Sequence, residues 1–299
     1  IKKIHRAYLE AGVNAVETNG FGASALRLEE FDFKKFNTSA LAINLPIDIT
    51  RATKSEIAYH VSVQAARIAR AAIEEYKTSK SYDKRPLYVF GCVGPSNCFL
   101  TSSRAQLKHV SYEQIVDNSC EKALGLIDGG VDAFTLETHQ DPLELKAIIH
   151  GVQRAQLERK VKRPIFVHVT VYAFSRMPIF HTHILAAYAT VEGTGIDAFG
   201  INCSTGPAEM ESTVRCLSEN SRLPISVLPN AGLPVNQNGK LVYNLTPQEF
   251  AGYLKRFVED YGVQMVGGCC GTTPGHLRAA VAELRGLKGH KGHKGHKGQ

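Results

Sequence analysis

One short pattern recurs along the chain and constrains the fold more than any other feature. Each copy has the end of a helix, a glycine, a short apolar run and then polar residues; the copies span residues 11–19, 130–139, 193–204 and 261–271. Glycine is a common helix terminator. The apolar run is too short for a helix and does not alternate with polar residues, which is typical of a strand buried on both faces. The pattern therefore predicts buried strands that each follow a helix.

Three further apolar runs fit the same role, at residues 87–93, 164–171 and 224–229. Stretches with helical apolar spacing lie between the strands, at residues 57–76, 112–128, 143–157, 207–218 and 247–261. Strands that alternate with helices indicate parallel strands joined by crossovers. The chain also opens on a predicted helix, residues 1–11, with no strand before it. Eight helices and seven strands predict an α/β fold, a (β/α)8 TIM barrel that lacks its first strand in this chain.

The positions of the polar residues favour a barrel over an open, doubly wound sheet. Cysteines and other polar residues follow several different strands, as they do in barrel active sites at the C-terminal ends of strands. An open sheet would place its ligand site at one switch point instead. Two segments, residues 31–51 and 173–183, are expected to be loops that are atypical of such a barrel.

The charge and the C-terminus indicate how much of the chain folds. The net charge is +7, but the final residues KGHKGHKGHKGQ contain four lysines and no acidic residue. The remaining charge is modest and gives no argument for a nucleic-acid partner. Because the Gly-His-Lys run has no apolar side chain to bury, residues 287–299 are predicted to be a disordered tail, typical of an engineered tag. A natural metal-binding tail is the alternative. Residues 1–286 are predicted to form one domain.

The apolar runs and the cysteine content bear on the compartment. No run of about 18 apolar residues is present, so no membrane-spanning segment is predicted. Seven cysteines, two of them adjacent, fit a reducing compartment and metal or catalytic use better than a disulfide framework. We therefore expect a cytoplasmic protein.

Cys203, Cys269 and Cys270 are the candidate metal ligands. They follow two predicted strands, in the segments GINCS and GGCCG. In a barrel the C-terminal ends of the strands open on one face, so the three thiolates can converge. Since neighbouring residues of a strand point to opposite faces, the backbone must leave strand geometry near Cys269 and Cys270, which the adjacent glycines permit. Three thiolates fill three positions of tetrahedral zinc and leave the fourth open, as in a catalytic site.

An open position beside three thiolates suits a substrate thiol, whose pKa falls when it binds the metal. The predicted chemistry is alkyl transfer onto sulfur. The spacing alone leaves alternatives open, since a buried cysteine is often a small hydrophobe, and Cys269 and Cys270 are also compatible with a vicinal disulfide or a redox pair. The remaining cysteines are predicted to be structural; they are Cys92, Cys98, Cys120 and Cys216.

Five motifs carry a resemblance to a known family. The segments GINCSTGP, PNAGLP, GGCCGTTPGH, LETHQDPLELKA and VFGCVGPSN resemble the homocysteine S-methyltransferase family, over about residues 1–284. The resemblance is closest to the homocysteine-binding domain of cobalamin-dependent methionine synthase. It implies a (β/α)8 barrel, a methyltransferase activity that makes methionine, and zinc bound by Cys203, Cys269 and Cys270. The family's first-strand motif, of the type Asp-Gly-Ala-Met-Gly, is missing before Ile1.

The resemblance also implies substrate-binding residues. Glu137, in LETH, is expected to bind the homocysteine ammonium group. Asn202 and Asn230 are expected to position the substrate or the cysteines, with a purely structural role in turns as the alternative. Thr18 and Asn19, in ETNGFGAS, match a family segment at the barrel mouth. No catalytic residue is predicted beyond the zinc-bound substrate thiolate.

The implied cofactors and partners follow from the same resemblance. Zinc is the implied metal, and methylcobalamin on a separate domain is the implied methyl donor, recharged from methyltetrahydrofolate. The implied partners are homocysteine and the folate and cobalamin domains of a larger enzyme, with no nucleic acid and no membrane. The alternative enzyme is a stand-alone homocysteine methyltransferase that uses S-methylmethionine or a betaine-like donor. The alternative from another class is a non-catalytic zinc or redox domain.

Overall fold

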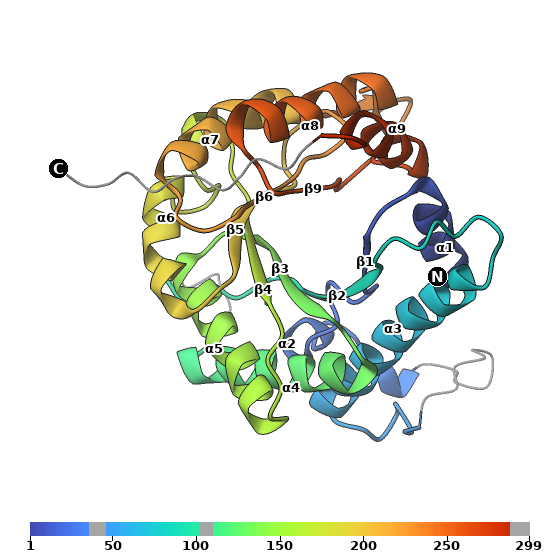
Figure 1. The fold of residues 1–299 in the computed structure, drawn as a ribbon. Coiled ribbons are helices and arrows are strands. Elements are labelled where there is room, and N and C mark those ends of the chain that lie inside the picture. Colours follow the sequence, from blue (N-terminus) through green and yellow to red (C-terminus); the bar gives the residue numbers. More distant parts are fainter. Residues whose placement is uncertain (36–45, 102–109, 288–299) are drawn as a thin grey trace. The chain divides into compact units, whose positions relative to one another are not determined.

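Parallel strands alternate with helices along most of the chain (Figure 1). The structure, a computed structural model, describes residues 1–35, 46–101 and 110–287. The strands of the main sheet are β1 (Ala15–Glu17), β2 (Tyr88–Val93), β3 (Ala133–His139), β4 (Ile165–Val169), β5 (Ala198–Asn202), β6 (Ile225–Leu228) and β9 (Met265–Val266). The helices are α1 (Lys2–Ala11), α2 (Ala25–Leu28), α3 (Lys54–Lys77), α4 (Tyr112–Gly129), α5 (Pro142–Glu158), α6 (Ile184–Val191), α7 (Pro207–Asn220), α8 (Pro247–Tyr261) and α9 (Pro274–Leu284).

The strand order confirms the predicted fold class. The seven strands of the sheet follow the order β1-β2-β3-β4-β5-β6-β9, so strands that are consecutive in the alternating pattern are neighbours. The pairs β1–β2, β2–β3, β4–β5, β5–β6 and β6–β9 are all parallel. A doubly wound sheet would reverse its order at a switch point. The fold is therefore α/β, of the TIM-barrel type without its first strand.

Two compact units make up the chain. The first comprises residues 1–5, 15–136 and 141–164, and in it α4 packs against both α3 and α5, while α3 and α4 contact β2. The second comprises residues 6–14, 137–140 and 165–299. Figure 1 shows α6, α7 and α8 on the outer side of β4, β5 and β6 within this second unit. The last residues of β3 belong to the second unit.

The glycine of the repeated sequence pattern has the conformation that its place requires. Gly12, Gly130, Gly195 and Gly262 all have a positive φ, between +64° and +107°. Gly130 and Gly262 are the C-cap residues of α4 and α8, in the left-handed conformation that suits glycine there. The prediction that these glycines end the preceding helix is confirmed.

The residue two places after three of these glycines links its strand to the preceding one. In each case a side-chain oxygen accepts a hydrogen bond from a backbone N–H at or next to the start of the neighbouring strand. The pairs are Val89 with Asp132 at 2.7 Å, Ile165 with Asp197 at 2.8 Å and Ile225 with Gln264 at 2.7 Å. The polar residue of the repeat therefore helps to fix the register of neighbouring strands.

Three side-chain positions form one row across the strands of the second unit. His168 of β4 is in register with Gly200 of β5, which is in register with Ser226 of β6. A Cβ at Gly200 would lie 1.7 Å from the carbonyl oxygen of Ser226. Because Gly200 has no side chain, His168 Nε2 reaches Ser226 Oγ at 2.7 Å. Burial lowers the pKa of His168 to about 4, so this ring is neutral at pH 7.

An antiparallel hairpin after β6 was not expected from the apolar pattern. It consists of β7 (Pro234–Gln237) and β8 (Lys240–Tyr243). Its strands are largely exposed, so they lack the continuous apolar runs of the main sheet. The signal for it is Asn238-Gly239, whose φ angles of +53° and +80° fit the tight hairpin turn that this dipeptide favours.

The less regular segments are described only in part. Of the loop predicted at residues 31–51, residues 36–45 lie outside the described residues, and Phe33–Lys35 form a 3-10 turn. In the loop at residues 173–183, Arg176 forms bridges to both Tyr172 and His183. The predicted tail lies outside the described residues from position 288 onward. No helix in the described part of the chain is long and apolar enough to cross a bilayer.

Candidate metal centre

Cys203 directly follows β5 and has an unusual backbone conformation. Cys203 and Ser204 have φ angles of +60° and +61°, in the left-handed region that residues other than glycine rarely adopt. The Cys203 N–H donates to the carbonyl oxygen of Leu228 at 3.1 Å, and Ser204 Oγ donates to the carbonyl oxygen of Val171 at 2.6 Å. Strain of this kind persists only where surrounding bonds hold it, and it is frequent at functional sites.

Cys269 and Cys270 lie beyond the end of β9. The strand ends at Val266, so the backbone has left strand geometry before either cysteine, as the sequence predicts. The Cys269 N–H donates to the carbonyl oxygen of Pro229 at 2.8 Å, and the Cys270 N–H donates to Asn230 Oδ1 at 3.0 Å. The segment after β6 therefore fixes the backbone of both cysteines.

The three thiols converge. Cys270 Sγ lies 3.7 Å from Cys203 Sγ and 4.0 Å from Cys269 Sγ, and all three sulfurs are within 4.8 Å of one another. Tetrahedral zinc with Zn–S bonds of about 2.3 Å requires sulfurs about 3.8 Å apart. None of the seven cysteines is in a disulfide. Among the described residues, no other group of three or more His, Cys, Asp or Glu side chains has metal-binding geometry. The cluster fits a zinc ion with three protein thiolates.

The thiols interact strongly with one another. Hydrogen bonds from Cys203 and Cys269 lower the pKa of the Cys270 thiol to about 3. The hydrogen bond with Cys203, the one with Cys270 and burial raise the pKa of Cys269. One thiolate is thus stabilised by two S–H donors, and a second or third negative charge is opposed by repulsion. A divalent cation at the centre would remove that opposition, because each thiolate would face the cation.

Glu137 is connected to this cluster through Asn202. Glu137, in β3, is 8 % exposed, and Asn202, at the end of β5, is fully buried. Asn202 Nδ2 donates to Glu137 Oε2 at 3.3 Å and to Thr138 Oγ1 at 2.9 Å, and Asn202 Oδ1 accepts from the Thr138 N–H at 2.9 Å. Since Asn202 immediately precedes Cys203, one buried amide joins a carboxylate to the backbone of a cluster cysteine.

Asn230 has a defined structural contact with the cluster. Its side chain is buried and accepts from the Cys270 N–H, while its own N–H donates to the carbonyl oxygen of Thr205 at 3.1 Å. The sequence left open whether Asn230 positions a cysteine or has only a structural role in a turn. The hydrogen bond from the Cys270 N–H is the contact that positioning a cysteine requires.

Thr18 and Asn19 belong to the first unit, whereas the three cysteines, Glu137, Asn202 and Asn230 belong to the second. Thr18 is buried, and its Oγ1 accepts from the Cys92 N–H at 3.0 Å. Its own N–H donates to the carbonyl oxygen of Phe90 at 2.9 Å. Thr18 thus joins the end of β1 to β2. Asn19 is exposed.

The comparison with family models decides the family. A model described as homocysteine S-methyltransferase matches residues 1–284. The chain belongs to the homocysteine S-methyltransferase family. This is a family of methyltransferases, as the sequence motifs predict, and the match extends over both compact units.

Two relatives of this family member are methionine synthases. The chain is 40 % identical over 282 residues to the methionine synthase of Mycobacterium leprae, a match that covers 94 % of this chain and 21 % of the relative. It is 39 % identical over 288 residues to that of Mycobacterium tuberculosis, covering 95 % of this chain and 22 % of the relative. The chain therefore spans about a fifth of the length of these curated relatives.

A solved structure shows the same fold. The metallated form of the homocysteine methyltransferase MmuM from Escherichia coli has a TM-score of 0.68 at 21 % identity, with 94 % of this chain and 83 % of that chain covered. At 21 % identity, this likeness shows that the two chains share a fold and nothing further.

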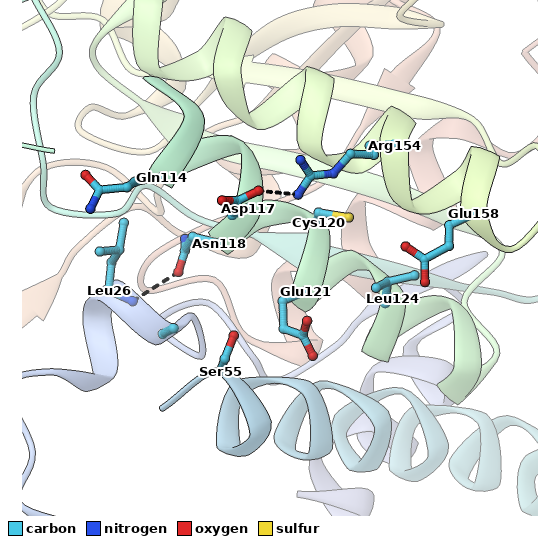
Figure 2. A pocket seen from close by; sticks show the side chains of 11 residues that line it. Leu26, Ser55, Gln114, Asp117, Asn118, Cys120, Glu121, Leu124, Arg154 and Glu158 are labelled. Carbon is cyan, nitrogen blue, oxygen red and sulfur yellow. Dashed lines mark hydrogen bonds and ion pairs between the residues drawn. The ribbon is translucent and has the colours of Figure 1, made fainter. Parts of the chain in front are cut away.

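The first unit contains a cavity of about 540 Å³ that includes none of the predicted site residues (Figure 2). Asn118 accepts from the Leu26 N–H at 3.0 Å, and Arg154 pairs with Asp117 at 2.6 Å. Burial and the charge of Glu158 raise the pKa of Glu121. The cavity is lined by side chains of α2, α3, α4 and α5: Ala25, Leu26, Ser55, Gln114, Asp117, Asn118, Cys120, Glu121, Leu124, Arg154 and Glu158.

Several residues around the thiol cluster were not predicted from the sequence. Ser204 and Thr138 were not singled out; the Ser204 hydroxyl donates to the carbonyl oxygen of Val171, and the Thr138 hydroxyl accepts from the side chain of Asn202, which precedes Cys203. Tyr243 was also missed, because it belongs to the hairpin that the apolar pattern did not predict. The Asn238-Gly239 dipeptide was the available signal for that hairpin, but nothing in the sequence places the ring of Tyr243 against Gly271, 28 positions later.

Proposed function

We propose that this chain is the homocysteine-activating module of a methionine synthase and that Cys203, Cys269 and Cys270 bind zinc. The observation that carries the proposal is the spacing of the three thiols, at 3.7 and 4.0 Å along two of the pairs, which suits tetrahedral coordination. When bound, the zinc ion would lower the pKa of the homocysteine thiol at its open fourth position. None of the seven cysteines forms a disulfide, which agrees with a cytoplasmic location as part of this proposal.

Glu137 is proposed to bind the ammonium group of homocysteine. The carboxylate is buried and oriented by the Asn202 amide, which also lies next to Cys203. A charge-assisted hydrogen bond from an ammonium group to such a carboxylate contributes about 1.5–3 kcal/mol. Asn202 and Asn230 are proposed to orient Glu137 and Cys270 respectively. Thr18 and Asn19 are further candidates for the substrate site.

The proposed reaction is methyl transfer onto the homocysteine sulfur. The sulfur forms a bond to the methyl carbon while the bond between that carbon and the donor breaks, and the bonding electron pair leaves with the donor. The product is methionine. We propose methylcobalamin on a separate domain as the donor and the folate and cobalamin domains of a larger enzyme as the partners. The identity of 39–40 % with two methionine synthases supports this choice.

Metal analysis with and without homocysteine tests the proposal. The purified protein is expected to bind one zinc ion per chain, and homocysteine is expected to change the metal's coordination, seen by substituting Co²⁺ and recording its spectrum. Glu137→Gln should retain zinc but weaken homocysteine binding by roughly tenfold to a hundredfold, the equivalent of the hydrogen bond above. Zinc held by a fourth protein ligand, with no response to homocysteine, would support a non-catalytic zinc domain instead.

A panel of methyl donors tests which donor the protein uses. With homocysteine and the zinc-loaded protein, methionine is expected from methylcobalamin. Turnover with S-methylmethionine or a betaine as the sole donor would contradict the methionine synthase assignment and favour the stand-alone enzyme.

A further inference from the structure

The two adjacent cysteines of the cluster form the first half of a tight turn. The turn runs from Cys269 to Thr272, and the Thr272 N–H donates to the carbonyl oxygen of Cys269 at 3.2 Å. Gly271, its third residue, has a φ of +76°, as a type II turn requires at that position. Because the backbone of this turn carries both Cys269 and Cys270, its conformation sets where their sulfurs lie.

The side chain of Thr272 reinforces the turn. Thr272 Oγ1 donates to the carbonyl oxygen of Cys269 at 2.6 Å, so that oxygen accepts two hydrogen bonds from one residue. A Cβ placed on Gly268 would lie 2.6 Å from Thr272 Oγ1, so the absence of a side chain there leaves room for the hydroxyl to reach back. The segment after β6 adds a further bond, from the Ala231 N–H to the carbonyl oxygen of Cys270 at 2.9 Å.

The far end of the turn is bound by a residue of the first helix. The hydroxyl of Tyr8, on α1, donates to the carbonyl oxygen of Thr272 at 2.9 Å, across 264 positions of sequence. Burial raises the pKa of Tyr8, so the phenol keeps the proton that it donates at neutral pH. Tyr8, Thr272 and the cluster cysteines all belong to the second unit. A helix far away in the sequence thus contacts the turn that carries two of the three thiols.

The end of α1 is itself packed against α9, the helix that follows the turn. A Cβ placed on Gly12, directly after α1, would lie 2.9 Å from Val281 Cγ1 of α9. Gly12 has a φ of +107°, which a residue with a side chain rarely adopts. The Tyr8 hydroxyl is therefore presented to Thr272 from a helix that is held in place at its C-terminal end.

A fixed turn matters for metal binding because a cation binds only the conformation in which the sulfurs are at coordination distance. The apparent affinity falls in proportion to the fraction of metal-free molecules that have this conformation. Repulsion between neighbouring thiolates favours opening of the turn in the metal-free protein. The bonds from the segment after β6 hold Cys269 and Cys270, and the Tyr8 bond holds Thr272, at the end of the turn.

We propose that Tyr8 is a positioning residue of the metal centre, whose hydroxyl holds the turn from Cys269 to Thr272 in the conformation that binds the metal. The inference rests on the proposed zinc function. It adds a residue that touches neither the metal nor the substrate and acts through the backbone beside two ligands. It also separates two steps: Tyr8 affects binding of the metal, whereas Glu137 affects binding of homocysteine to the metal-loaded protein.

The variant Tyr8→Phe isolates the hydroxyl, because the ring stays in place. The matched control is Tyr188→Phe on α6, whose hydroxyl accepts from the Arg222 N–H at 2.9 Å. Each variant removes one hydroxyl that bonds to the backbone of the second unit, but only Tyr8 bonds to the cysteine turn. Zinc affinity is measured by competition with a chelator, and homocysteine affinity by calorimetry on the zinc-loaded protein. Hydrogen exchange of the amides of residues 269–272 is measured on the metal-free protein, and thermal unfolding establishes that each variant folds.

Tyr8→Phe is expected to weaken zinc binding by about threefold to tenfold, the equivalent of one neutral hydrogen bond. The amides of the turn should exchange faster in the metal-free variant, because the turn opens more often. Homocysteine affinity of the zinc-loaded variant should be unchanged, since the bound metal then holds the sulfurs. Tyr188→Phe should keep the zinc affinity and the turn exchange of the unaltered protein, even if it unfolds at a lower temperature.

Three results would overturn the inference while the proposed function stands. The first is a Tyr8→Phe protein with unchanged zinc affinity. The second is an equal loss of zinc affinity in Tyr8→Phe and Tyr188→Phe, which would reflect general destabilisation. The third is a weaker zinc affinity without faster exchange of the turn, which would show that Tyr8 does not hold it. If the unaltered protein itself binds no zinc, the proposed function and this inference fail together.

Discussion

Polar side chains near the strand ends are used differently in the two units. In the second unit, the sulfurs of Cys203, Cys269 and Cys270 interact mainly with one another, so their capacity to bind a cation is retained. In the first unit, the Thr18 hydroxyl is occupied by the Cys92 N–H. The carboxylate of Glu144 is likewise occupied, by the N–H and hydroxyl groups of Ser96. Residue type and position identify the three cysteines and Thr18 as candidates. Only the hydrogen bonds show which polar atoms already serve the fold.

The units also differ in the character of one buried titratable group taken from each. His168 in the second unit is fully buried, and burial lowers its pKa to about 4. Glu144 in the first unit is 1 % exposed, and burial raises its pKa to about 7 despite its hydrogen bonds to Ser96. Both groups are favoured in the neutral form, but they give stability opposite dependences on pH.

The largest expected effect is on metal retention in the second unit. Cys269→Ser removes one of three thiolates, and zinc affinity should fall by more than about a hundredfold, since structural zinc sites with four ligands bind with about 10–16 kcal/mol. Cys216→Ser, at a partly exposed position on α7, is the matched control and should retain the metal. Zinc content after dialysis against a chelator is the measurement. Equal retention by the two variants would show that the cluster is not the metal site.

The second effect is the pH dependence of stability. His168 has a folded pKa of about 4, below its usual 6.5, so its contribution is present above pH 6.5 and is lost as pH falls toward 4. Urea unfolding should show a loss of up to about 3 kcal/mol over this range, at about 1.4 kcal/mol per pH unit. Faster hydrogen exchange of the backbone amides of β4 and β6 at low pH should report the same loss of stability. His168→Gln should flatten this acid limb; the same slope in the variant would contradict the assignment.

The smallest effect concerns the first unit. Thr18→Val keeps the side-chain volume but leaves the Cys92 N–H without its acceptor, which should cost about 1–3 kcal/mol in the free energy of unfolding. Zinc affinity should be unchanged, because Thr18 takes no part in the hydrogen bonds of the cysteine cluster. Chemical unfolding and chelator competition measure the two quantities. If Thr18→Val folds stably but binds homocysteine more weakly, Thr18 would also have the predicted role in substrate binding.

The sequence by itself determined the strand–helix alternation and the candidate ligands. Both depend on local features: a glycine that ends a helix, an apolar run of strand length, and cysteines at fixed places after such runs. Gly130 and Gly262 end their helices, as predicted, in a left-handed conformation that glycine adopts at little cost. The family motifs added the zinc and homocysteine hypotheses to this pattern.

The tertiary structure alone decided how the candidates are connected. Asn202 reaches Glu137 across 65 positions of sequence and Asn230 reaches Cys270 across 40. The ring of Tyr243 lies against Gly271, next to that cysteine in sequence, only because an exposed hairpin folds back there. Such bonds depend on strand order and on the exact path of turns, which hydrophobic periodicity does not record. Periodicity reports which residues leave water, whereas a hydrogen bond requires two particular atoms within about 3 Å of each other.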